Sequence, residues 1–145
     1  MGAEFYIQYQ AVRDQSVNIC EPLEIEDYLI QPMEDASPPK WHLAHVTWFF
    51  ETFLLKPFSP GYKVFSEPFE VLFNSYYNGV GPQHPRGLRG TLSRPTVQQV
   101  LDYRAHVDHH MAILLNENMS EQASIRAMLG IHHEQQHQEL LFTDI

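Results

Sequence analysis

Apolar side chains recur at a helical period in four segments of the chain, and polar or proline-rich stretches separate these segments. In the first segment, residues 4–20, apolar positions at loosely helical spacing predict a helix that Pro22 ends. Residues 23–30 predict one or two further turns, and residues 33–39 predict a loop. The N-terminal part of the chain therefore predicts one long helix followed by a short connection.

The second helical segment begins at Ser37-Pro38-Pro39, which predicts a helix start with serine as the N-cap and proline in the first turn. Residues 41–55 then carry a largely apolar stripe with a histidine in its middle. The stripe consists of Trp41, His45, Trp48, Phe49 and Thr52, at positions i, i+4, i+7, i+8 and i+11. A histidine on such a face needs a hydrogen-bonding partner or a metal ion, because an unpaired polar group is costly to bury.

Residues 56–95 show no sustained period and are rich in proline, glycine, serine and asparagine. A connection of this length is unusual in a compact domain, and such loops are usually functional or disordered. Many aromatic side chains favour a packed crossover loop here, with residues 74–79 at its centre. Tyr76 and Tyr77 are interpreted as aromatic packing on the helices, although lining of a metal pocket stays open.

Two further helices follow the crossover. Thr96 and Gln99 form a plausible capping box, and an apolar stripe runs from there through residues 97–115. Ser120 is placed to cap the last helix, whose pattern still runs at the end of the sequence. Gly130 within that helix predicts a kink or a close helix contact, because glycine costs up to ~1 kcal/mol relative to alanine there.

Four apolar stripes, one long crossover over about residues 56–95 and no convincing strand predict an all-α four-helix bundle. The length suits a single domain covering residues 1–145. Because the helical pattern continues to the end, we expect this domain to be the front part of a longer protein.

Composition narrows the possible partners. The chain has 9 basic and 18 acidic residues, a formal charge of −9, which argues against nucleic acid or an anionic membrane as its main partner. No apolar run approaches the ~20 residues that span a bilayer, and no signal peptide is apparent. The single Cys20 excludes an internal disulfide and is typical of a reducing compartment, so we expect a cytoplasmic protein.

The candidate chemistry lies in the last helix. His133 and His137 are four residues apart, so their rings lie one above the other and can bind the same metal ion. His45 is the third imidazole predicted to face the core, and together these residues predict a three-histidine metal site. Neutral imidazoles suit zinc, iron, nickel or copper, and three protein ligands leave open positions for water, substrate or dioxygen.

Several alternatives remain for this site. His133-Glu134-x-x-His137 is also the signature of zinc proteases, with Glu134 as general base, but only Glu139 and Asp144 follow as possible third ligands. We therefore disfavour the protease and interpret Glu134 as solvated or hydrogen-bonded near the site. His42 competes with His45 as a ligand, whereas His132 should point about 100° away from His133 and lie on the surface.

The four motifs Trp41–His45, Phe73–Tyr77, Arg89–Pro95 and His133–Leu140 together resemble the DinB-like N-terminal domain of the sulfoxide synthases of ergothioneine biosynthesis (EgtB-type). The resemblance extends from about Tyr9 to Ile145, and although each motif alone is weak, the combination is specific. It implies a DinB-like bundle in which three histidines bind one non-haem iron(II).

The resemblance also implies a reaction and its substrates. In that family the iron uses dioxygen (O2) to join a cysteine-type thiol to the imidazole of Nα-trimethylhistidine (hercynine), which gives a sulfoxide. The residue matching Gln136 lies near hercynine, and arginines of the crossover bind the carboxylate of the thiol substrate in some members. Arg86 and Arg89 are the arginines that can do this here, because a guanidinium grips a carboxylate with two hydrogen bonds.

Members of that family carry a C-terminal catalytic domain that resembles formylglycine-generating enzymes and supplies a catalytic tyrosine. The present sequence contains nothing of it, so we expect little activity from this chain alone and leave its catalytic residues unassigned. Two other functions stay open: a metal-dependent thiol transferase, with zinc or nickel as the ion, and a non-catalytic, metal-stabilised helical docking domain.

Overall fold

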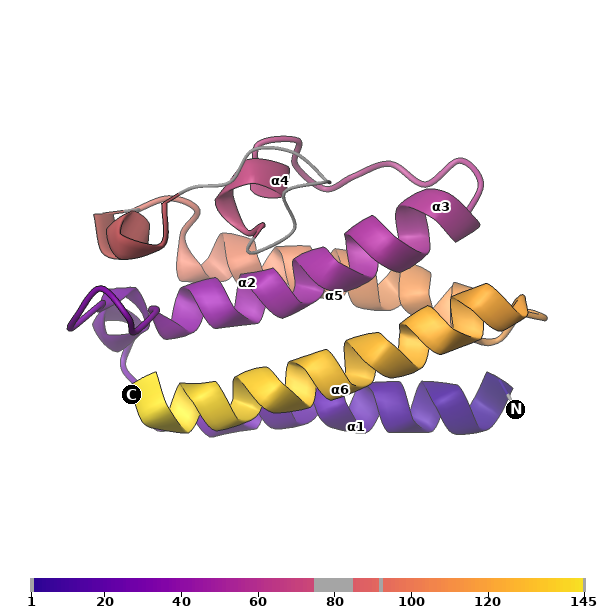
Figure 1. The fold of residues 1–145 in the computed structure, drawn as a ribbon, viewed down its shortest axis with the longest axis horizontal. Coiled ribbons are helices and arrows are strands. Elements are labelled where there is room, and N and C mark those ends of the chain that lie inside the picture. The colour runs from indigo at the N-terminus through magenta and orange to yellow at the C-terminus, as the bar shows by residue number, and fades with distance from the viewer. Residues whose placement is uncertain (1, 75–84, 92, 145) are drawn as a thin grey trace.

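The computed structural model describes residues 2–74, 85–91 and 93–144, and every regular element in these ranges is helical. The four long helices are α1 (Gly2–Cys20), α2 (Pro39–Phe50), α5 (Val97–Leu115) and α6 (Glu121–Asp144). A π-helical segment, η2 (Glu51–Leu55), continues α2 into α3 (Lys56–Phe58). The predicted all-α fold class is thereby confirmed (Figure 1).

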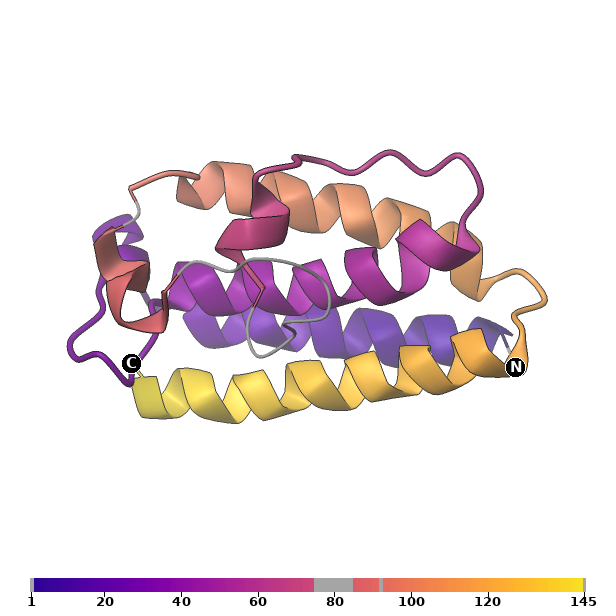
Figure 2. The same cartoon turned by 45° about the horizontal axis from the view of Figure 1, so that its top comes forward.

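The long helices pack as a four-helix bundle. Helix α1 contacts α6 and α5, and α2 contacts α5 and α6, so each helix has two main neighbours. Figure 2 shows that α2 and α5 run in the same direction and that α1 and α6 run in the opposite one. This up-down-down-up order requires the chain to return along the bundle between α2 and α5, and the long crossover makes that return.

The crossover contains short helices of its own in its described parts. These are α3, α4 (Phe69–Leu72) and the 3-10 helix η3 (Arg86–Thr91), and another 3-10 helix, η1 (Ile25–Leu29), follows α1. Helix α4 lies over α2, where the indole nitrogen of Trp41 donates to the carbonyl of Leu72 at 3.3 Å (Figure 1). Most of the predicted loop centre, with Tyr76 and Tyr77, lies outside the described residues.

Two of the three predicted helix starts are confirmed. The Thr96 hydroxyl accepts from the backbone N–H of Gln99 at 3.1 Å, and the Ser120 hydroxyl accepts from the N–H of Ala123 at 3.1 Å. The prediction for Ser37 was wrong, because Pro38 is the N-cap of α2 and makes no side-chain cap. Ser37 instead accepts from Arg89 Nη1 at 2.8 Å, so its hydroxyl ties the crossover to the start of α2.

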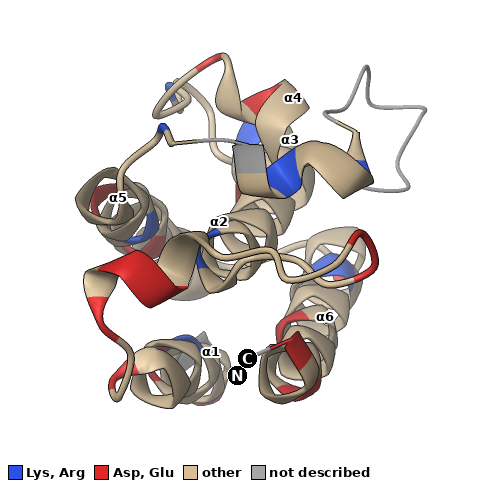
Figure 3. Ribbon diagram, turned by 90° about the vertical axis from the view of Figure 1, so that its left-hand side faces the viewer, with Lys and Arg blue, Asp and Glu red and all other residues tan. Residues whose placement is uncertain are grey.

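Gly130 marks a close contact between helices. A Cβ atom at this position would lie 2.5 Å from Cε1 of Phe50 and 3.1 Å from Cδ1 of Phe49. Because such contacts are far inside van der Waals range, only glycine lets α6 approach α2 this closely. The approach sets α6 beside α2, two of the helices that Figure 3 shows end-on.

A buried network of ion pairs and hydrogen bonds joins α6 to α1 and α5. Glu134 is fully buried and accepts from Arg13 Nη1 at 2.8 Å, Ser16 Oγ at 2.6 Å and Arg104 Nη2 at 3.2 Å. Arg13 also donates to Asp108 at 2.7 Å. Of the two roles that the sequence left open for Glu134, solvated or hydrogen-bonded, the structure shows the hydrogen-bonded one. The side chain ties α6 to α1 and α5.

No helix among the described residues is long and apolar enough to cross a membrane.

Candidate metal centre

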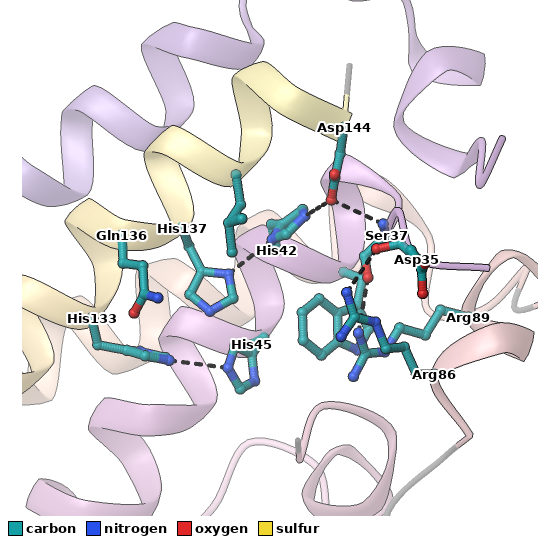
Figure 4. A pocket seen from close by; sticks show the side chains of 12 residues that line it. Asp35, Ser37, His42, His45, Arg86, Arg89, His133, Gln136, His137 and Asp144 are labelled. Atoms are coloured by element: carbon teal, nitrogen blue, oxygen red, sulfur yellow. Dashed lines mark hydrogen bonds and ion pairs between the residues drawn. The ribbon is translucent and has the colours of Figure 1, made fainter. Parts of the chain in front are cut away.

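Three histidines from two helices converge at one point. His45 of α2 and His133 and His137 of α6 each offer one ring nitrogen, and these three atoms all lie within 4.8 Å of one another (Figure 4). The i, i+4 spacing aligns the two rings of α6, and the close contact at Gly130 sets α2 beside them. The structure thus brings together the three residues that the sequence proposed as ligands.

The ring of His45 is oriented by the crossover. Its Nδ1 lies 2.6 Å from the carbonyl oxygen of Phe73, so Nδ1 carries the proton and Nε2 keeps its lone pair. That Nε2 lies 3.1 Å from Nε2 of His133. Two nitrogens that each bind one metal ion at ~2.1 Å are roughly 3.0–3.4 Å apart at octahedral or tetrahedral angles, so the observed pair fits a shared ion.

The ring of His137 is held by a second histidine. Its Nδ1 lies 2.9 Å from Nδ1 of His42, and Nε2 of His42 lies 2.7 Å from Asp144. The same Asp144 oxygen accepts from the backbone N–H of Ser37 at 3.0 Å. His42 was the competing candidate for the ligand position of His45, but the structure places it behind His137 and outside the three-histidine cluster.

Burial keeps the three imidazoles neutral. Desolvation lowers the pKa of His133 to about 4, and it also lowers the pKa of His45 and His137, with neighbouring imidazoles adding to the effect at these two rings. Metal ions bind the neutral imidazole, so these rings are in the required protonation state at neutral pH.

The donor set also fits a metal ion. Nδ1 of His133 is buried and has no hydrogen-bonding partner among the described residues. Without an ion, Nε2 of His133 must carry the proton and donate it to Nε2 of His45, 3.1 Å away. A metal ion would be bound by both Nε2 lone pairs in place of that proton, and Nδ1 of His133 would carry the proton of its ring. The fit to a metal ion therefore rests on the two facing Nε2 atoms, because Nδ1 lacks a partner among the described residues in either case.

A cavity of about 360 Å³ opens beside the three rings. Gln136, Arg86 and Arg89, which the sequence proposed as substrate-binding residues, all line it (Figure 4). The guanidinium of Arg89 lies 3.5 Å from the centre of the Trp41 ring, and Arg86 Nη2 donates to the carbonyl of Asp35 at 2.7 Å. Their role toward a substrate stays a prediction.

The cavity also has residues that sequence reasoning did not assign to it. Trp41 stacks on His45 with ring centroids 4.4 Å apart, and Asp35, Ser37 and Asp144 complete the polar wall. Asp144 had a signal that could have found it, because it follows His137 by seven residues and so shares its helix face. His132, in contrast, is exposed and bonds to Gln135 at 3.1 Å, as predicted for a surface residue.

Fold and site define a class of protein: an all-helical bundle whose core presents three histidines able to hold a metal ion. The sequence profile of the DinB superfamily matches residues 8–141, and the chain belongs to this superfamily. Comparison with curated proteins finds no match.

Proposed function

We propose that this chain is the iron-binding domain of an oxygen-dependent sulfoxide synthase that joins a cysteine-type thiol to hercynine. The observation that carries the metal-binding part is the convergence of His45, His133 and His137 within 4.8 Å. Membership of the DinB superfamily agrees with it. The choice of iron(II) and of these substrates rests on the resemblance of four motifs to the ergothioneine-forming enzymes.

The residues around the cavity have separate tasks in this proposal. A bound iron(II) would supply open coordination positions for dioxygen and for a substrate imidazole. Gln136, an exposed residue of α6 that lines the cavity, would hydrogen-bond hercynine in this proposal. Arg86 and Arg89 bring guanidinium groups to the wall of the cavity, and these suit the carboxylates of the organic substrates.

The cavity is not fully enclosed, and no tyrosine is among the described residues that line it. We propose that a C-terminal domain covers the cavity and completes the site. The chain alone should then bind metal but form little sulfoxide, and robust turnover without an added domain would contradict this part of the proposal.

A metal-dependent thiol transferase is the second candidate, because three neutral imidazoles suit zinc and nickel as well as iron. In that function the ion would activate a thiol as its thiolate without dioxygen. Oxygen-independent transfer by the zinc- or nickel-loaded chain would favour it over the sulfoxide synthase. Stabilisation by the metal with no turnover in any assay would favour a docking domain.

Metal analysis of matched variants tests the ligand assignment. We expect His133→Ala and His137→Ala to abolish stoichiometric iron(II) binding under anaerobic conditions, because each removes one of three ligands. His132→Ala is the control, since its ring is exposed and points elsewhere on the same helix. Equal metal content in all three variants would remove the assignment.

A further inference from the structure

Behind the cluster, a chain of hydrogen bonds runs away from His137 to the end of α6. The chain passes from Nδ1 of His137 to Nδ1 of His42 over 2.9 Å, and from Nε2 of His42 to Asp144 Oδ2 over 2.7 Å. Figure 4 shows this row on the wall of the cavity. The ring of His42 is 3% exposed and the side chain of Asp144 is 11% exposed, so the chain is largely shielded from water.

The direction of these hydrogen bonds is fixed by the carboxylate. An ionised carboxylate only accepts, so Nε2 of His42 must carry the proton that bonds to Asp144. A neutral His42 then has a bare Nδ1, which can only accept, and Nδ1 of His137 must donate to it. The tautomer of His137 that results has its lone pair on Nε2, the nitrogen free to face a metal ion.

The carboxylate is itself held in the ionised form. Its partial burial opposes ionisation, but the hydrogen bonds from His42 and from the backbone N–H of Ser37 lower the pKa of Asp144 below its usual value. Ser37 is also the acceptor for Arg89, so the far end of the chain is anchored to η3. The carboxylate therefore has a fixed position as well as a fixed charge.

We propose that His42 and Asp144 are positioning residues that fix His137 in the tautomer and orientation required for metal binding through Nε2. This inference rests on the proposed metal-binding function and adds two residues to it. His45 is set in the same way by the carbonyl of Phe73, so two of the three rings are fixed by a defined acceptor. Such partners typically change metal affinity 10–100-fold when they are removed.

Cobalt(II) titration of the purified chain measures the effect on affinity. We expect Asp144→Ala to raise the dissociation constant for Co(II) by about 10–100-fold, because it removes the acceptor that fixes the proton of His42 on Nε2. Glu139→Ala is the matched control, since it removes a carboxylate from an exposed site on the same helix. It should leave affinity within about twofold, because isolated surface charges contribute little.

Nitrogen NMR of the histidine rings separates positioning from a general loss of structure. Long-range ¹H–¹⁵N spectra of the metal-free chain should show His137 protonated on Nδ1 and His42 on Nε2. In Asp144→Ala we expect a mixture of tautomers at both rings, with the backbone amide spectrum of the bundle retained. His42→Asn, which keeps an acceptor near the position of Nδ1, should bind Co(II) more tightly than His42→Leu.

The outcomes distinguish this inference from the function on which it depends. If the unaltered chain binds Co(II) and Asp144→Ala binds it equally well, or if His137 keeps a single Nδ1–H tautomer in that variant, positioning by Asp144 is wrong while the metal site stands. If the unaltered chain binds no Co(II), both the site and its positioning residues are wrong.

Discussion

At the scale of single residues, the neighbours of each buried histidine determine its role. His42 and His45 lie three residues apart on α2, and both are almost fully buried. Nε2 of His45 faces His133, whereas His42 faces His137 with one nitrogen and a carboxylate with the other. Chemically identical side chains on one helix therefore take different parts, as a candidate ligand and as its support.

The buried thiol of Cys20 is expected to be unreactive. Burial raises its pKa to about 11, against a smaller opposite effect of Arg104, so only ~0.1% is thiolate at pH 8. In the native chain we predict very slow reaction with a disulfide reagent at pH 8, rising as pH approaches 11, and fast reaction in denaturant. Rapid labelling of Cys20 in the native chain would show that solvent reaches the end of α1. It would also make Cys20 a candidate reactive thiol in a transferase.

At the scale of helices, α6 has different functions on different sides. Its histidines contact α2, whereas Glu134 and Gln138 bond to α1, the latter to the carbonyl of Val12 at 2.8 Å. Its exposed side carries Gln136 at the mouth of the cavity. A single helix thus supplies ligands, a structural ion network and a candidate substrate contact.

The close approach of α6 to α2 predicts a large effect of a small substitution. Gly130→Ala should lower the free energy of unfolding by about 1–3 kcal/mol, because its Cβ would clash with Phe50. The gain in helix propensity, up to ~1 kcal/mol, opposes this loss without cancelling it. Urea denaturation measures the difference.

Gly87→Ala is the control for that substitution, since its Cβ would lie 3.6 Å from the nearest atom, an ordinary contact. We expect the stability of this variant to be nearly unchanged. If Gly130→Ala were as stable as the parent chain, the two helices would not be as close as the structure shows.

The ion network of α6 predicts a second stability effect. Glu134→Gln should destabilise the bundle by about 3–5 kcal/mol, because it removes the carboxylate that two buried guanidinium groups share. Arg104 then loses its ion pair, and Arg13 keeps only the one with Asp108. Chemical denaturation of Glu134→Gln and of the exposed Glu139→Gln compares the two. Similar stability of both variants would mean that water reaches the network.

At the scale of the whole molecule, the fold does not depend on the metal for its core. Two tryptophan rings, several phenylalanines and the aliphatic residues of all four long helices form one buried cluster. The histidines border this cluster and open to the cavity. A metal ion should therefore stabilise a bundle that already exists.

Metal addition is accordingly predicted to raise the melting temperature without changing helix content. An ion at 100 times its dissociation constant adds about 2.7 kcal/mol of stability. Circular dichroism of the chain with a chelator and with Co(II) tests both parts, and His133→Ala should show no shift. Loss of the helical signal on chelation would instead make the metal part of the folding core.

The extent of sequence-based prediction differed between helices and loops. The period of apolar residues predicted the four long helices, and local capping patterns predicted the starts at Thr96 and Ser120. The start at Ser37 was predicted wrongly, because the same hydroxyl found a distant partner in Arg89. A local pattern cannot show whether a side chain will bond to its own helix or to a segment far along the chain.

By itself, the sequence determined that the chain is helical and that His133 and His137 share one helix face, because both follow from the 3.6-residue period. Only the tertiary structure decided that His45, and not His42, completes the cluster, and that His42 links His137 to Asp144. These contacts join residues about a hundred positions apart. They depend on how closely and at what rotation two helices pack, which the spacing along either helix does not specify.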